Sequence, residues 1–497
     1  MRNHFLNLPI LVFIIVSPGC TPLVSRQFVA ESERPPHCQL FFDELDGAVD
    51  ADDVRDASAA VVPGFPYLRA NRFLASFTDQ LTTEDQKQQW VQEMHRLDLE
   101  TRKKEIHNLS LSAIKAFGDR FGESFNRDAL LEKTTAYSEK LLAHDQRHPD
   151  FYAALKRAVE IPDEYSTGLR VVGLYPITSM PVAAVTRKVY AEFRQWHQLP
   201  RSELATIGAL RVYGPAEHLS VTNEQISRLW DRSKRNALGM PILSDQARQK
   251  LLRIYAPVFL QDLAADYDEI GEVYWDADRV AVNSMAPSVY YYFSNARFKG
   301  APILQINYVV WYSARDGPHS PRIERGRLDG ITVRISLDTN GHPFMVDIMN
   351  NCGCYHFFIP LERRVQRILP SPQALDAFVP RWLPERFPER RLSIRVKTGW
   401  HQVDNIDAIR MPSELIPYQL VPYEQLEMLP QDGLRSESLF DSMGIAKNSE
   451  RIEPLIFFPM GIRAIGSMRQ RGHHAIKFVG RAHFDDPHIF DDNFEFR

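Results

Sequence analysis

Hydrophobic residues recur with a helical period through the first half of the chain. Trp90, Met94 and Leu97 are spaced i, i+4 and i+7, so a helix that begins after Thr83 would bury one face. Thr83 and Gln86 have the spacing of a capping box, in which each side chain satisfies a backbone N–H of the other. The same period predicts helices over 126–144, over 150–161 and from Pro181 onward. Their predicted buried residues are Leu130, Tyr137, Leu141, Val182, Val185, Val189, Phe193 and Trp196.

The pattern changes to strands in the second half of the chain. Runs rich in β-branched and aromatic residues cover 289–293, 303–312, 331–337, 343–349, 355–359 and 392–397, and shorter candidates lie at 169–174 and 476–479. Asn340-Gly341 separates two of these runs and is a strong hairpin signal, because both residues tolerate positive φ. We therefore expect an α+β protein, with an N-terminal helical region followed by a mainly antiparallel β-rich region.

One predicted strand has two different faces. Alternation over 303–312 places Gln305, Asn307, Val309 and Trp311 on one side and only apolar or tyrosine side chains on the other. A polar and aromatic face of this kind either lines a cleft or is the covered outer face of a sheet. Gln305, Asn307 and Trp311 are therefore candidates for lining a cleft.

The N-terminus has the pattern of an export signal. Arg2 precedes an apolar run over 6–16, and Gly19-Cys20 follows a small-residue exit. The run has about 11 residues, against the roughly 20 that a spanning helix needs. Gly19-Cys20 resembles the signal of bacterial lipoproteins, in which Cys20 would be lipidated. In that class an Asp at the next position favours the inner membrane, so Thr21 indicates the outer membrane, with the body periplasmic or surface-facing.

Composition then divides the chain into regions. Residues 1–19 form the signal, residues 20–62 are predicted to be a flexible acidic tether, residues 63–245 are mainly helical, and residues 246–497 are β-rich. The chain has 497 residues and a net charge of −4, so no global basic field would attract nucleic acid. Four cysteines in this length exclude a disulfide-dense mini-protein.

The segment Cys352-Gly353-Cys354-Tyr355-His356 carries the sharpest local chemistry. Residues two apart share a face in an extended chain, so two thiolates and one imidazole would point the same way. Zinc or copper is the metal that such ligands would hold. Other arrangements stay open: a disulfide from Cys38 to Cys352 or Cys354, buried thiols, or a disulfide within the segment.

A second cluster lies near the C-terminus. Residues 468–488 hold four of the sixteen histidines, with acidic residues beside them. His473, His483 and Asp485 are candidate ligands for a metal site shared with His356 or His401, and a polar surface or a hydrogen-bonded network is the alternative. Cations in 463–481 are suited to a phosphate, a carboxylate or anionic lipid.

Three stretches of the chain resemble parts of uncharacterised proteobacterial lipoproteins. They are RLDGITVRISLD (327–338), CGCYHFF (352–358) and MRQRGHHAIKFVGRAHFDDP (468–487). The resemblance implies export and implies no catalytic role.

Three functional hypotheses follow from these patterns. The first is an exported, lipid-anchored binding or maintenance protein of the envelope, with a site near the CGCYH segment. The second is a periplasmic metal-dependent hydrolase, in which bound zinc lowers the pKa of a water molecule. The third is a non-catalytic scaffold for a protein partner.

Overall fold

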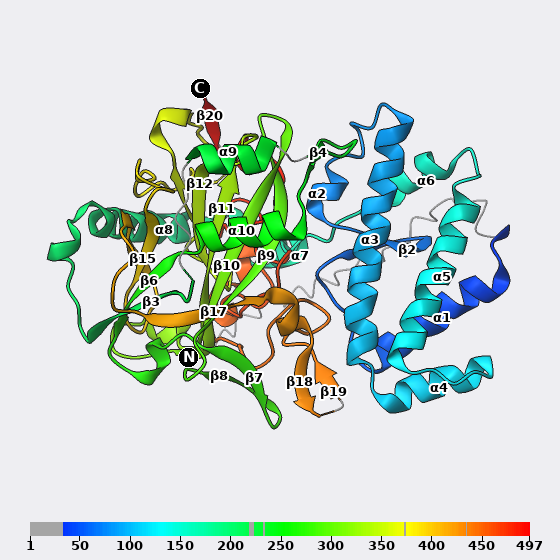
Figure 1. The fold of residues 1–497 in the computed structure, drawn as a ribbon. Helices are drawn as coiled ribbons and strands as arrows, with labels where there is room; N and C mark the ends of the chain where they lie inside the picture. The colour runs from blue at the N-terminus through cyan, green and yellow to red at the C-terminus, as the bar shows by residue number, and fades with distance from the viewer. Residues whose placement is uncertain (1–32, 218–222, 232–233, 372–373, 434) are drawn as a thin grey trace, which may run out of the picture.

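The chain folds into a helical body and a larger body built around one sheet, which lie side by side (Figure 1). The structure is a computed structural model, and it describes residues 33–217, 223–231, 234–371, 374–433 and 435–497. The predicted signal and the lipidation site Cys20 lie outside the described residues. The order of helices before sheet agrees with the predicted α+β class.

The helical body is formed by the first part of the described chain. Its elements are α1 (Pro36–Ala51), β1 (Ala60–Val62), β2 (Phe65–Ala70), α2 (Arg72–Ala75), α3 (Glu84–Asn108), α4 (Leu111–Phe121), α5 (Arg127–Asp145) and α6 (Phe151–Ala158). The predicted capping box at Thr83 and Gln86 is present and begins α3. Trp90 and Met94 are fully buried, and Leu130 and Leu141 of α5 share their hydrophobic core.

The predicted tether over residues 20–62 is wrong where the structure describes it. Residues 36–51 form helix α1, which buries Phe41, Phe42, Leu45 and Val49 in the core of the helical body. The acidic residues of this segment lie mostly between these positions, so the average composition hid an amphipathic period.

The second body contains a ten-stranded sheet. Its strand order is β13-β12-β11-β10-β9-β17-β3-β6-β15-β16. In chain order the strands are β3 (Ala209–Pro215), β6 (Val258–Leu263), β9 (Ser288–Phe298), β10 (Ala301–Arg315), β11 (Gly326–Leu337), β12 (Pro343–Asn350), β13 (Phe357–Pro360), β15 (Arg391–Val396), β16 (Val403–Ile409) and β17 (Ile416–Pro422).

Most pairs of this sheet are antiparallel, as predicted, but the sheet is mixed. β17 pairs in parallel with both β9 and β3, and β15 pairs in parallel with β6. The predicted hairpin at Asn340-Gly341 joins β11 to β12. The predicted boundary at residue 245 is wrong, because β3 comes before it in sequence and lies inside the sheet.

The sheet is covered on both faces. Helices α8 (Tyr175–Gln198), α9 (Asn223–Asp231) and α10 (Asp245–Tyr255) contribute to the core on one face, together with Tyr308 and Tyr312 of β10. Segments from residue 421 to the C-terminus cover the other face and bury Val309 and Trp311. The remaining elements are β4 (Lys234–Arg235), β5 (Pro241–Ile242), β7 (Glu272–Asp276), β8 (Arg279–Asn283), β14 (Val365–Ile368), β18 (Leu429–Asp432), β19 (Arg435–Glu437), α11 (Pro454–Phe457) and β20 (Phe494–Phe496).

This covering corrects the cleft prediction. Gln305, Asn307 and Trp311 are at most 1% exposed, so they line no cleft. The Gln305 amide donates to Ser336 Oγ at 3.0 Å, and the Asn307 amide donates to Ser294 Oγ at 2.9 Å. The polar face of β10 is therefore a hydrogen-bonded layer beneath the C-terminal segments.

Two short predicted strands are absent from the described chain. Residues 169–174 fall in helix α7 (Thr167–Val172) and the turn after it, and residues 476–479 form no strand. Val185 of α8 is 63% exposed, although the helical period placed it on the buried side. In α7 and the first half of α8 the apolar side chains thus face outward, which sequence periodicity alone cannot show.

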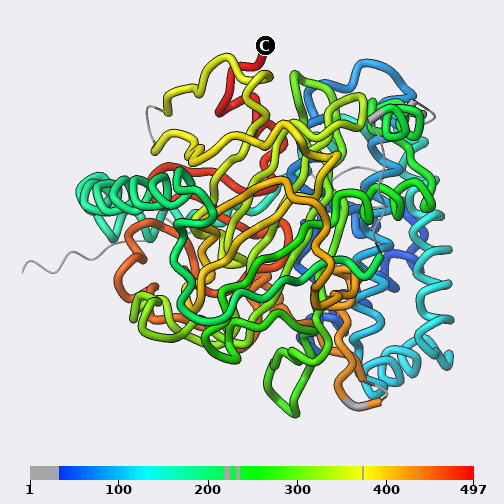
Figure 2. The backbone as a smooth tube through the Cα atoms, turned by 60° about the vertical axis from the view of Figure 1, so that its left-hand side comes forward, coloured from blue at the N-terminus to red at the C-terminus, as the bar shows by residue number. Residues whose placement is uncertain are grey.

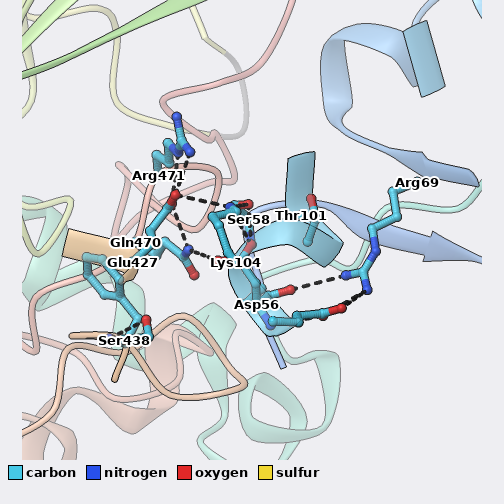
Figure 3. A network of polar contacts seen from close by, with 12 residues as sticks. Asp56, Ser58, Arg69, Thr101, Lys104, Glu427, Ser438, Gln470 and Arg471 are labelled. Carbon is cyan, nitrogen blue, oxygen red and sulfur yellow. Dashed lines mark hydrogen bonds and ion pairs between the residues drawn. The ribbon is translucent and has the colours of Figure 1, made fainter. Parts of the chain in front are cut away.

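A buried polar joint connects the two bodies (Figure 3). Lys104 of α3 lies 2.8 Å from Asp56 Oδ1 and 3.0 Å from Glu427 Oε2. The Gln470 amide donates to both carboxylates, and Arg471 donates to Glu427 at 2.6 Å. Lys104, Asp56 and Glu427 are almost fully buried, so each charge depends on its partners across the joint.

Candidate functional site

The CGCYH segment forms a tight turn between β12 and β13. Gly353 N–H donates to Asn350 O at 2.7 Å, and Asn350 N–H donates to Cys354 O at 3.0 Å. Gly353 has φ +88° and Tyr355 has φ +56°. The segment is therefore not extended, and the expectation that residues 352, 354 and 356 share one face fails.

His356 points away from the two thiols. Its Nε2 lies 2.9 Å from Asp347 Oδ2, and its ring packs against Phe358 and Phe484. Arg334 binds the same carboxylate through two nitrogens, at 2.9 and 2.6 Å. Burial lowers the pKa of His356, although Asp347 acts in the opposite direction.

Two of the C-terminal histidines, His473 and His483, contact acidic residues of the loop that precedes α7. His473 Nδ1 lies 2.7 Å from Glu164 Oε1, and its Nε2 lies 2.6 Å from the carbonyl oxygen of Ala57. His483 lies 3.2 Å from Asp163, and Asp485 lies 3.4 Å from Arg72. His473 is thus held by two hydrogen bonds, and His483 and Asp485 lie within ion-pair distance of oppositely charged groups, so these three residues do not converge on one point.

The six predicted metal ligands are thus not brought together. Over residues 33–497, excluding the short undescribed gaps, no group of three or more His, Cys, Asp or Glu side chains is arranged to hold a metal ion. Cys38, Cys352 and Cys354 are all free thiols. Cys38 lies in the core of the helical body, whereas Cys352 lies in a core of the sheet body, so a disulfide between them is also wrong.

A buried ionic cluster lies beside the CGCYH turn. Arg315, at the end of β10, binds Asp329 through two nitrogens, each at 2.9 Å. His401 Nδ1 lies 2.8 Å from Asp329 Oδ2, and its Nε2 lies 3.1 Å from Asp268 Oδ1. The His401 ring stacks on Tyr312 with centroids 3.9 Å apart.

The charges of this cluster stabilise one another. Burial opposes ionisation, but hydrogen bonds with Asp268 and Asp329 raise the pKa of His401. Burial also opposes the ionisation of Asp329, but Arg315 and His401 hold the pKa of this carboxyl well below its usual range. The two carboxylates therefore favour the protonated, imidazolium form of His401.

Glu324 links this cluster to the CGCYH turn. Its carboxylate accepts hydrogen bonds from Arg315 at 2.6 Å, from the Tyr355 hydroxyl at 2.5 Å and from Trp400 Nε1 at 2.9 Å. Because Tyr355 follows Cys354 directly, the turn and the ionic cluster form one unit.

Three residues other than glycine adopt left-handed backbone conformations in this unit. Leu328 (φ 55°) directly precedes Asp329, and Tyr355 (φ 56°) and His401 (φ 52°) are themselves polar members of the unit. Such conformations cost on the order of 1–3 kcal/mol each and concentrate where function requires a fixed geometry. The strain marks this unit as the candidate functional site.

Three further groups at the site, Cys352, Cys354 and Glu453, have shifted pKa values. A hydrogen bond from Cys354 and the nearby Arg315 guanidinium lower the pKa of Cys352, while the bond to Cys352 and burial raise that of Cys354. Glu453 is 5% exposed, and burial, with Cys352 and Glu324 nearby, raises its pKa to about 8. Shifts of this kind are typical of reactive sites.

Sequence reasoning missed most of this site. Asp268, Arg315, Glu324, Asp329 and Glu453 were not among the predicted residues, and His401 was considered only as a metal ligand, whereas it pairs with Asp268 and Asp329. Asp329 carried a usable signal, since it is a charged residue at the start of an apolar strand. Its partners Asp268 and His401 come from distant segments, so no spacing along the chain could connect them.

Comparisons with known proteins add no further constraint. No protein-family model, curated protein or solved structure matches the chain. Among the helices of the described residues, none is both long and apolar enough to cross a bilayer.

Proposed function

We propose that this is an exported, lipid-anchored envelope protein that lies on a bilayer and has a binding or maintenance role there. The N-terminal pattern that ends at Cys20 motivates the export and anchoring. The observation that carries the proposal is an apolar surface on α7, α8 and α11, which we call the docking surface. Its residues are Val171, Val172, Leu174, Ile177, Met180, Val185, Leu455, Ile456 and Phe458.

The docking surface is strongly exposed. Eight of its nine side chains are between 54% and 81% exposed, with Leu455 the highest. Figure 2 shows α7 and α8, in teal green, projecting from one edge of the molecule. Contiguous exposed apolar patches on a folded protein mark sites of contact with proteins or membranes.

The docking surface is held in place by packing beneath it. Gly173 lies between α7 and α8, and a Cβ there would approach Pro459 Cα to 2.4 Å, so the two segments touch. Arg170 donates to the carbonyls of Met460 at 2.9 Å and Gly480 at 2.6 Å. The apolar side chains therefore project from a fixed base.

Charge favours a bilayer as the occupant of this surface. Residues 165–191 and 454–484 contain no Asp or Glu. Arg187 and Lys188 lie exposed on α8 just beyond Val185, and neither makes an ion pair with another described residue. Apolar side chains bordered by cations are typical of helices that lie in the interface of anionic membranes.

The length of chain before the described body permits this contact. The segment from Cys20 to Glu33 contains 13 peptide units and spans at most roughly 45 Å when extended. A lipid on Cys20 would therefore keep the body within that distance of the membrane. We place the protein's activity at the strained unit around the CGCYH turn.

Vesicle flotation tests the docking. We would use the chain that begins at Thr21, which retains every described residue and lacks the lipid. It should float with vesicles that contain phosphatidylglycerol and less with phosphatidylcholine alone. Met180→Glu should reduce flotation at least about tenfold, because a charge must then be buried among acyl chains.

The matched control is Met285→Glu, since Met285 is 90% exposed and lies outside the docking surface. It should float as the parent chain does. A parent chain that stays unbound, or equal losses in both variants, would contradict the proposal. Retention by a protein partner without vesicle binding would favour the scaffold hypothesis.

A further inference from the structure

Cys352 and Cys354 lie in one tight turn. The backbone N–H of Cys354 donates to Cys352 Sγ at 3.4 Å, and each thiol shifts the pKa of the other. Cys352 is 4% exposed and Cys354 is partly exposed. Of the two residues, Cys354 is therefore the nearer to solvent.

The turn that holds the two thiols is fixed from outside. Gly353 has φ +88°, and a Cβ at this position would lie 2.4 Å from the carbonyl oxygen of Ala475. Any other residue would be both strained and in collision. On the following side, the Tyr355 hydroxyl is bound to Glu324. These contacts fix the backbone of the turn that carries the two thiols.

The surroundings separate the roles of the two thiols. The cation Arg315 acts on Cys352 and favours its thiolate, while Cys354 keeps its proton. Cys352 therefore loses its proton more readily than Cys354 does. Glu453 is a buried acid whose charge acts on both sulfur atoms.

We propose that Cys352 and Cys354 are a redox-active dithiol that forms an intramolecular disulfide by exchange with small-molecule disulfides. The thiolate of the pair attacks one sulfur of the external disulfide RSSR and expels RS⁻. The second thiol gives its proton to solvent, attacks the mixed disulfide and expels another RS⁻. Both thiolates leave as RSH, so two protein thiols are oxidised and one RSSR is reduced to two RSH.

This inference deepens the site proposed above and does not depend on membrane docking. Export would place the pair in an oxidising compartment, where such couples operate. Disulfides that close strained rings are the labile and regulatory ones. A ring closed across a single glycine belongs to that class.

The test uses the full-length chain in detergent, reduced and then equilibrated with mixtures of reduced and oxidised glutathione near neutral pH. We expect the two thiols to disappear together, the chain to become two hydrogen atoms lighter, and peptide mapping to find Cys352 joined to Cys354. Cys38 should remain a free thiol, which is detected by alkylation after the chain is unfolded. Reductant should restore the thiols of Cys352 and Cys354. Thiols that stay free, or that react independently, would overturn the proposal.

Two variants separate the steps. Cys354→Ser should stop at one bound glutathione per chain, because the resolving thiol is gone, whereas Cys38→Ser should behave as the parent.

Discussion

His356 Nε2 lies 2.9 Å from Asp347 Oδ2, and the same carboxylate neutralises Arg334. All three side chains are at most 6% exposed. Asp347 therefore binds one buried cation and one buried imidazole, which gives its replacement a predictable cost.

We predict that Asp347→Asn lowers the free energy of unfolding by about 3–5 kcal/mol, because Arg334 keeps its charge and loses its partner in a buried place. Urea unfolding followed by circular dichroism measures this change. Glu495→Gln is the control, since its pair with Arg367 is exposed, and it should change stability by less than about 1 kcal/mol. Equal effects of the two substitutions would contradict the burial argument.

We predict that His401 contributes stability at low rather than high pH. Its pKa is raised in the folded chain, so its contribution is full below the unfolded value of about 6.5 and is lost as pH rises through the folded value. Asp268 and Asp329 have lowered pKa values, so their contributions are full above the unfolded value of about 4 and are lost on further acidification.

The difference in unfolding free energy between the parent chain and His401→Asn should therefore be largest between about pH 4 and 6.5 and should shrink toward alkaline pH. Urea titrations across this range measure it. A difference that grows with pH would show that His401 is buried as a neutral ring.

We predict that Lys104→Met destabilises the junction of the two bodies by about 3–5 kcal/mol, because Asp56 and Glu427 would share a buried site without their common cation. Thermal unfolding by calorimetry should also lose cooperativity, with the helical body separating earlier. The neighbouring Lys103→Met is the control: Lys103 is 54% exposed and pairs with Glu424 at the surface, so a change below about 1 kcal/mol is expected.

We predict that Cys20→Ser abolishes lipid incorporation in bacteria that process lipoproteins. Labelling with radioactive palmitate should mark the parent chain and not the variant. Cys38→Ser should be labelled as the parent is, since Cys38 is buried in a folded core. A labelled Cys20→Ser chain would refute lipid attachment at this residue.

Local signals in the sequence predicted local structure well. The Thr83 and Gln86 capping box and the Asn340-Gly341 hairpin depend on neighbours a few residues apart, and both are confirmed. Composition averaged over a window was misleading for 36–51, where Phe41 and Leu45 are buried and the acidic positions lie mostly outside the core. β-branched residues at 171–172 suggested a strand, yet they lie on an exposed helix.

The candidate site was only partly predictable for a related reason. Cys352 and Cys354 were visible because they are adjacent in sequence. Their predicted partner His356 turns away, since Gly353 and Tyr355 reverse the chain between them. The charges that act on the thiols, Arg315 and Glu453, come from segments far apart in sequence, so only the folded chain connects them.

The position of β17 in the sheet constrains the order in which the protein can be completed. β17 lies between β9 and β3, and without it the two groups of strands share no backbone hydrogen bonds through this position. A chain that crosses a membrane N-terminus first delivers residues 416–422 after every other strand of the ten-stranded sheet. Until that segment arrives, the two half-sheets have unpaired edge strands, which are prone to aggregate. An exported chain would therefore depend on a chaperone that keeps it from aggregating until residues 416–422 have emerged.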